Sequence, residues 1–168
     1  MIRLIGVCLI VSAVIDFFFS KSRTLAVESK QMNEFYLYLK QLDINLMTYN
    51  FDTVKLTQIT SNASLFADND FICELSKRIS IDGDFNLAFR NTVDKNKILE
   101  ELGIIESYEK VAEVIGKKDV DYQHKMLNLC IQEVNDKKVL QNLNLDEKKA
   151  FYRKLGFLSG IFVIIILM

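Results

Sequence analysis

The 168-residue chain contains no proline and no tryptophan, only six glycines, and a single histidine, His124. So few glycines leave few β-turn signals, and no segment shows sustained alternation of apolar and polar residues, so no strand is predicted. The three cysteines are widely spaced and form no Cys-x-x-Cys or disulfide framework. With one histidine in addition, the chain lacks the ligand pairs from which zinc sites are built. We therefore predict neither a metal nor another cofactor.

An excess of one charge is also absent. The chain has 21 Lys plus Arg against 22 Asp plus Glu, which gives a net charge near −1. Nucleic-acid-binding proteins usually present a strongly basic surface, so we expect no nucleic-acid partner. The length corresponds to one ordinary domain of ~100–200 residues.

Motifs of the common enzyme classes are missing. There is no phosphate-binding loop, dinucleotide fingerprint, nucleophile elbow or His-Glu-x-x-His sequence. Close pairs of carboxylates occur at 68/70, 100/101 and 119/121, where they resemble helix caps or solvated faces. We expect no enzyme. Composition alone leaves a cysteine–histidine nucleophile open, against the simpler interpretation of buried cysteines and a surface histidine.

What the chain does have is an apolar run at each end. Residues 1–19 carry only two charges, Arg3 and Asp16. About 20 helical residues span the ~30 Å hydrocarbon core of a bilayer. A cleaved signal peptide is the alternative, but bulky Phe17, Phe18 and Phe19 stand where small cleavage-site residues belong. We predict an uncleaved transmembrane helix over residues 1–20.

The second run covers residues 155–168 and carries no charge. As a helix it reaches ~21 Å, or ~27 Å if residues 151–154 are added with Arg153 and Lys154 extending to the interface. A buried core helix is the alternative for so short a run. We predict a transmembrane helix over 155–168, which leaves 21–154 as the domain between the two spans.

Basic residues flank both runs on the side of this middle segment: Lys21, Arg23, Lys148, Lys149, Arg153 and Lys154. The middle segment is therefore predicted to be cytoplasmic. We expect Asp16 to form an ionic contact with Arg153 or Lys154 near one membrane face. Gly156 and Gly160 form a Gly-x-x-x-Gly pair, which allows a second helix to approach closely in lipid. Gly156, Gly160 and Asp16 are thus the predicted residues of membrane-helix packing.

The middle segment has helical periodicity. Its clearest apolar seam steps by 3 and 4 residues and consists of Met32, Phe35, Leu39, Leu42, Leu46 and Tyr49. This spacing predicts one helix packed against others, with a coiled coil as the alternative. Further apolar faces predict short helices after Asp52, up to Gly83, after Asp84, from about Lys95 to Gly103, and up to Gly116. The fold class is all-α: a bundle of about six helices flanked by the two spans.

The last helix begins at Asp119, the predicted N-cap. No proline or glycine occurs between Asp119 and Gly156, so this helix can continue into the second span as one rod of ~75 Å. Asn142 and Asn144 are the places where it could break instead.

Several stretches together resemble one family. They are Arg3-Leu4-Ile5-Gly6, the helix at 32–47, the sequence IGKKDVDYQHK with Gly116, Asp119 and Gln123, and YRKLGFLSGIFVIIILM at 152–168. In this order and spacing they resemble the stage III sporulation protein AB family of endospore-forming bacteria. Members of that family commonly have a proline-containing turn after the second helix, whereas residues 47–52 contain none.

The resemblance implies an all-helical domain similar to the cytoplasmic domain of type II secretion and type IV pilus platform proteins. It implies a non-enzymatic scaffold in the channel complex between mother cell and forespore, located in the mother-cell membrane around the forespore. The implied partners are a cognate ATPase and membrane ring subunits, with room for a homo-oligomer. The alternative is a membrane-anchored or secreted helical adaptor unrelated to such a channel. Lys117, Lys118, Asp119 and Gln123 are the candidate partner surface, against the interpretation of a merely solvated face.

Overall fold

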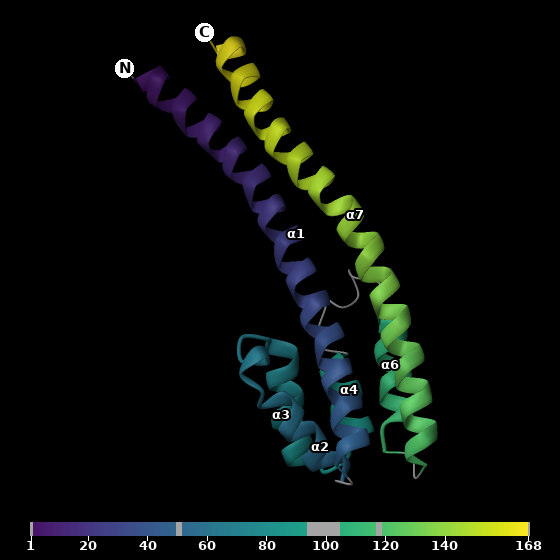
Figure 1. The fold of residues 1–168 in the computed structure, drawn as a ribbon. Coiled ribbons are helices and arrows are strands. Elements are labelled where there is room, and N and C mark those ends of the chain that lie inside the picture. Colours follow the sequence, from purple (N-terminus) through teal and green to yellow (C-terminus); the bar gives the residue numbers. More distant parts are fainter. Residues whose placement is uncertain (1, 50–51, 94–104, 117–118, 168) are drawn as a thin grey trace. The chain divides into compact units, whose positions relative to one another are not determined.

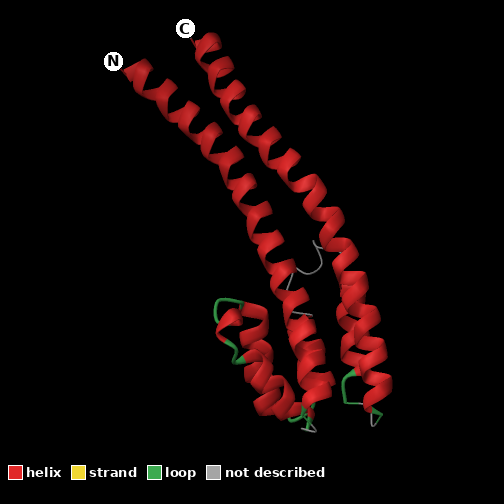
Figure 2. Ribbon diagram, viewed as in Figure 1, coloured by secondary structure: helices red, strands yellow, loops and turns green. Residues whose placement is uncertain are grey.

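The described part of the chain is built from helices. A computed structural model describes residues 2–49, 52–93, 105–116 and 119–167. Among these residues every regular element is helical and no strand occurs (Figure 2), which confirms the all-α class. The elements are α1 (Ile2–Thr48), α2 (Thr53–Ser61), the 3-10 turn η1 (Ser64–Phe66), α3 (Asp70–Asp82), α4 (Phe85–Val93), α6 (Ile105–Val114) and α7 (Val120–Leu167). The helix predicted from Lys95 to Gly103 lies outside the described residues.

The chain forms two compact units. The terminal unit comprises Met1–Ser29 with Val139–Met168, and the bundle unit comprises Lys30–Lys138. The sequence places divisions at 20/21 and 154/155, at the edges of the apolar runs. Both α1 and α7 pass through those edges without a break. The terminal unit extends beyond the first edge to Ser29, a further 9 residues, and beyond the second edge back to Val139, a further 16 residues. Hydropathy marks a change of side-chain polarity, whereas the units follow contacts between helices.

The bundle unit has a continuous apolar core. Five residues of the predicted seam on α1 are buried: Met32, Phe35, Leu39, Leu42 and Leu46. Tyr49 is the exception, with 46% of its surface exposed, because α1 ends at Thr48. α3 packs against α2 and α4, and α4 packs against α6. The five buried seam residues share one core cluster with Phe71 of α3 and Phe89 of α4, which confirms the seam as an intradomain packing surface.

Aromatic rings connect these helices through the core. The Phe71 ring on α3 lies edge-on to Phe35 of α1 and to Phe89 of α4, with centroid distances of 6.3 and 5.7 Å. Phe89 also stacks on Phe85 at 5.3 Å. Such pairs contribute about 0.5–1.5 kcal/mol each beyond the burial of their area. The rings therefore fix α1, α3 and α4 against one another.

The helix ends follow the predicted punctuation. Gly83 ends α3 in a left-handed conformation with φ 66°, and Gly116 follows α6 with φ 91°. Glycine suits both positions because it lacks the Cβ that disfavours positive φ. At the start of α7, the Asp119 carboxylate accepts a hydrogen bond of 3.1 Å from the Asp121 amide. The predicted cap at Asp119 is confirmed.

α7 is continuous over 48 residues. Neither asparagine breaks it, because each side chain uses a bond compatible with the helix. The Asn144 amide donates to the Leu140 carbonyl one turn earlier, at 3.2 Å. The Asn142 side-chain oxygen accepts a bond of 3.0 Å from the Ser29 hydroxyl of α1. The prediction of one continuous helix in this segment is therefore confirmed.

In the terminal unit α1 and α7 are antiparallel, with the N- and C-terminal ends at the same end of the pair (Figure 1). Ser22 of α1 and Leu145 of α7 are buried. Among the residues described, no helix is long and apolar enough to cross a membrane. The side chains of 2–5, 7–9, 163–164 and 166–167 within the apolar runs lie outside that set. The two predicted spans stay predictions.

Candidate functional site

The two glycines of the Gly-x-x-x-Gly pair face α1 within the terminal unit. A Cβ added at Gly156 would lie 3.1 Å from the Cβ of Phe18. One added at Gly160 would lie 3.4 Å from a methyl carbon of Ile15 and 3.6 Å from Val11. Both glycines are buried. The missing side chains thus allow close approach of the two helices, as small residues do in tightly packed helix pairs.

Asp16 has no part in this contact. It is exposed and lines a recess on α1 together with Ser20 and Arg23. Within the described residues, the expected ion pair between Asp16 and Arg153 or Lys154 is not formed. The reason is helical phase: Phe18 faces α7, and two residues correspond to about 200° around the helix axis. The side chain of Asp16 therefore points away from α7.

The candidate partner surface at the α6–α7 turn is only partly described. Lys117 and Lys118 lie outside the described residues. Asp119 caps α7, and the Gln123 side-chain oxygen accepts a bond of 3.3 Å from the Gly116 amide. Gln123 is only 6% exposed. Asp119 therefore caps α7 and Gln123 bonds back to Gly116, whereas the exposed large hydrophobic side chains beside them are Val120 and Tyr122.

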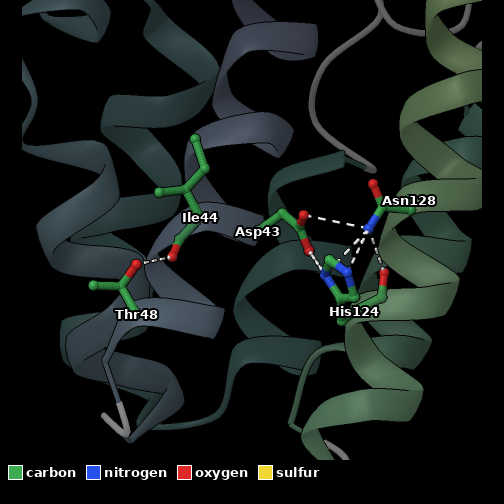
Figure 3. A network of polar contacts seen from close by, with 5 residues as sticks. All are labelled: Asp43, Ile44, Thr48, His124 and Asn128. Atoms are coloured by element: carbon green, nitrogen blue, oxygen red, sulfur yellow. Dashed lines mark hydrogen bonds and ion pairs between the residues drawn. The ribbon is translucent and has the colours of Figure 1, made fainter.

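A polar cluster that sequence analysis missed lies in the bundle unit. Figure 3 shows Asp43 of α1 directed toward His124 and Asn128 of α7. One Asp43 oxygen lies 2.7 Å from His124 Nδ1, and the other accepts a bond of 3.3 Å from the Asn128 amide. The side chains of His124 and Asp43 are 40% and 13% exposed. The cluster thus fastens the C-terminal half of α1 to the start of α7.

No spacing pattern could have revealed this cluster, because Asp43 and His124 are 81 residues apart. Only the helical phase of both residues, combined with knowledge that α1 and α7 are neighbours, brings them together. The cluster also accounts for the lone histidine as a partly exposed hydrogen-bonding residue. Its ring contacts Asp43 and Asn128.

A second polar group joins α6 to α7. Lys110 lies 3.2 Å from Glu133 and 3.3 Å from Glu106, and Lys137 lies 3.4 Å from Glu133. Partial burial works to raise the pKa of Glu133, but the hydrogen bonds and charges of Lys110 and Lys137 outweigh it and lower that pKa. Hydrogen bonds to Glu133 and Glu106 raise the pKa of Lys110. The group is a charge network of the kind that links helices.

The structure describes the side chains of two cysteines, Cys73 and Cys130. Cys130 is buried, and burial raises the pKa of its thiol, which disfavours the reactive thiolate. The sulfur of Cys73 faces the carbonyl oxygens of Phe66 and Ala67 at 3.7 and 3.5 Å. Neither is among the hydrogen-bonding partners of His124. No cluster of three or more potential metal ligands occurs in the part of the chain that the structure describes.

Comparison with known proteins extends over almost the whole chain. The family model for stage III sporulation protein AB matches residues 3–168, a range that includes both apolar runs, the bundle unit and the turn before α7. Neither the curated proteins nor the solved structures contain a match to this chain. Because the family model matches nearly the whole sequence, the chain belongs to the stage III sporulation protein AB family.

Proposed function

We propose that the protein is a non-enzymatic platform of the sporulation channel complex between mother cell and forespore. In this role the bundle unit lies in the cytoplasm, docks a partner ATPase and connects it to membrane ring subunits. The single observation that supports the proposal most is the family match over residues 3–168. A match of this extent includes the ends as well as the helical domain.

Anchoring in the mother-cell membrane is the first part of the proposal. Two observations support it: the apolar runs at 1–19 and 155–168, and the continuity of α1 and α7 from those runs into the bundle unit. Backbone hydrogen bonds restrain the φ and ψ angles of a continuous helix, whereas a flexible linker has no such restraint.

Docking of the ATPase at the α6–α7 turn is the second part. Val120 is 37% exposed and Tyr122 is 48% exposed, next to Lys117 and Lys118 in sequence. Tyrosine is enriched in protein interfaces because it combines a large apolar area with a polar end. Asp119 caps α7 and Gln123 bonds back to the Gly116 amide, so Val120 and Tyr122 are presented on the first turn of a capped helix.

Site-specific crosslinking in sporulating cells tests the docking part and the platform role. A photo-crosslinking residue would replace Tyr122 in one strain and Ile81, which is 81% exposed on α3, in a matched control strain. After extraction in mild detergent, we expect a crosslink to the ATPase from position 122 and none from position 81. Recovery of neither the ATPase nor a ring subunit, under conditions that preserve the assembly, would count against the platform role.

A second experiment separates a scaffold from an enzyme. Replacing Cys73 and Cys130 by alanine and His124 by asparagine removes all thiol and imidazole groups of the bundle unit. The platform proposal predicts normal sporulation wherever the variant accumulates to the wild-type level. Loss of sporulation at unchanged protein level would instead indicate cysteine–histidine chemistry.

A further inference from the structure

We propose that the terminal unit carries a basic belt that binds the phosphate groups of anionic membrane lipids. The belt consists of six side chains on two helices: Lys21 and Arg23 on α1, and Lys148, Lys149, Arg153 and Lys154 on α7. The inference rests on the proposed membrane anchoring and adds the class of lipid that the anchor selects.

The register of the two helices brings these residues together. Phe18 meets Gly156, and Ser29 bonds Asn142 at 3.0 Å. Because the helices are antiparallel, residues 19–28 of α1 lie alongside residues 143–155 of α7. All six basic residues fall between these two contacts. A rise of 1.5 Å per residue limits this interval to about 15–20 Å along the pair.

Within the described residues, the basic side chains of the belt have no carboxylate partner. Among the described contacts none of the six forms an ion pair, whereas Lys30, Arg78 and Lys110 of the bundle unit all do. Lys149 is half-buried and the other five are exposed. The three acidic residues in the same interval are Glu28, Asp146 and Glu147, toward its Ser29–Asn142 end. Six positive and three negative side chains leave the interval with a net positive charge.

The surroundings of the belt favour a lipid over a soluble phosphate. Toward the chain ends the same two helices expose large apolar side chains, among them Phe17 at 60%, Phe157 at 69% and Leu158 at 61%. In a bilayer, the phosphate groups lie directly beside the acyl chains. Cationic side chains next to an exposed apolar surface can therefore contact the phosphates while the apolar surface contacts the acyl chains. Lysine and arginine reach that boundary because their apolar stems follow the hydrophobic surface while the charge stays in water.

Lipid titration of the full chain in neutral detergent tests the belt. The probes are phosphatidylglycerol, phosphatidylcholine and, as a soluble source of the same chemistry, glycerol phosphate. We expect the chain to bind phosphatidylglycerol in preference to the other two. At about 1 kcal/mol per basic residue near the surface, the double variant Lys21→Gln/Arg23→Gln should lower the association constant about 30-fold. Arg153→Gln/Lys154→Gln should lower it similarly, because both helices contribute to one belt.

The matched control removes the same charge elsewhere. Lys77 and Lys125 of the bundle unit are exposed, and the double variant Lys77→Gln/Lys125→Gln should bind phosphatidylglycerol as the wild type does. Equal binding of the two phospholipids by the wild type would overturn the proposal. So would equal binding of glycerol phosphate, or an equal loss in the control variant.

Failure of the belt can be distinguished from failure of membrane anchoring. The same proteins would be reconstituted into vesicles of phosphatidylcholine alone and washed at alkaline pH. Retention in these neutral vesicles without a preference for phosphatidylglycerol would refute the belt and leave the anchor intact. Release from neutral vesicles would refute the anchor itself.

Discussion

Phe18 and Gly156 lie in direct contact, so that a Cβ added to the glycine would come within 3.1 Å of the Cβ of Phe18. This contact sets the register of α1 and α7 in the terminal unit. Gly160, one turn further along α7, has slightly more room, since its added Cβ would lie 3.4 Å from Ile15. The contact therefore distinguishes between two glycines that the sequence motif treats as equivalent.

The first prediction concerns these glycines. Gly156→Ala should destabilise the helix pair, because the overpacking cost of about 1–3 kcal/mol exceeds the gain of up to about 1 kcal/mol in helix propensity. Gly160→Ala should be nearly neutral. Gly6→Ala is the control, because no atom lies within 4 Å of the added Cβ. Thermal unfolding of the full chain in detergent measures the effect, and equal midpoints for Gly156→Ala and Gly6→Ala would refute the predicted register.

A second prediction concerns Asn69, which performs two functions at once. Its side-chain oxygen caps α3 by accepting from the Ile72 amide at 3.1 Å, and its amide donates to the buried Glu34 carboxylate of α1 at 2.8 Å. Asn69→Ala should cost about 1 kcal/mol for the cap and about 1–3 kcal/mol for the bond that Glu34 loses. Asn69→Asp retains the cap but places a second carboxylate beside Glu34.

Urea unfolding checks this prediction. We expect Asn69→Asp to be destabilised at neutral pH and to recover in acid, where protonation removes the repulsion between the two carboxylates. Asn62→Ala, at an exposed helix end, should change stability by less than about 0.5 kcal/mol. A small effect of Asn69→Ala, comparable with that of Asn62→Ala, would show that Asn69 does not link α1 to α3.

The third prediction concerns Asp43 and His124. The 2.7 Å contact predicts that Asp43→Ala and His124→Ala each weaken the bundle and that the two effects are not additive. A double-mutant cycle in urea should give a coupling free energy of about 0.5–3 kcal/mol. The exposed pair Arg90–Glu113, whose side-chain atoms lie 3.5 Å apart, is the comparison and should couple by at most about 1 kcal/mol. Additive effects at Asp43 and His124 would contradict the contact.

The fourth prediction is a pH dependence that comes from Glu133 and Lys110. The lowered pKa of Glu133 contributes stability above the ordinary value of 4.5, which is lost as the pH falls through the lowered pKa. The raised pKa of Lys110 contributes stability below its ordinary value of 10.5, which is lost as the pH rises through the raised pKa. We therefore measure the midpoint temperature of thermal unfolding as a function of pH. In Glu133→Gln this midpoint should depend less on pH than in the wild type, at both the acidic and the alkaline end of the profile.

Exposure and salt limit the size of this effect, so the profile of the wild type should also flatten at high ionic strength. Glu113→Gln serves as the control, because among the described ion pairs its exposed partner Arg90 contacts Glu113 alone. If Glu113→Gln altered the profile as much as Glu133→Gln did, the charge network between α6 and α7 would not be its source.

Local patterns in the sequence were enough to predict much of this fold. The seam from Met32 to Leu46 follows from its spacing, and the ends at Gly83, Gly116 and Asp119 follow from backbone chemistry. Asn69 is followed by an acidic residue, Asp70, and then by the apolar pair Phe71-Ile72, so its cap could have been recognised as well. These features depend on residues within a few positions of one another.

Features that depend on two distant helices could not be predicted in the same way. The Asp43–His124 contact and the Ser29–Asn142 bond join residues that are 81 and 113 positions apart. The sequence places Asp16 at the same predicted membrane face as Arg153 and Lys154, which is why it predicts an ion pair between them. The level of a residue along a membrane helix follows from its residue number. The direction of its side chain depends on which side of the helix faces the neighbouring helix, and this becomes known only from the contact of Phe18 with Gly156.

Membrane association of the intact chain tests the central claim most directly. Membranes from sporulating cells would be washed at alkaline pH and sedimented, and the mass of the protein in the pellet would be determined. We predict that the full-length chain stays in the pellet and that its N-terminal residues are retained. Release of the unprocessed chain into the supernatant would contradict the proposed membrane platform.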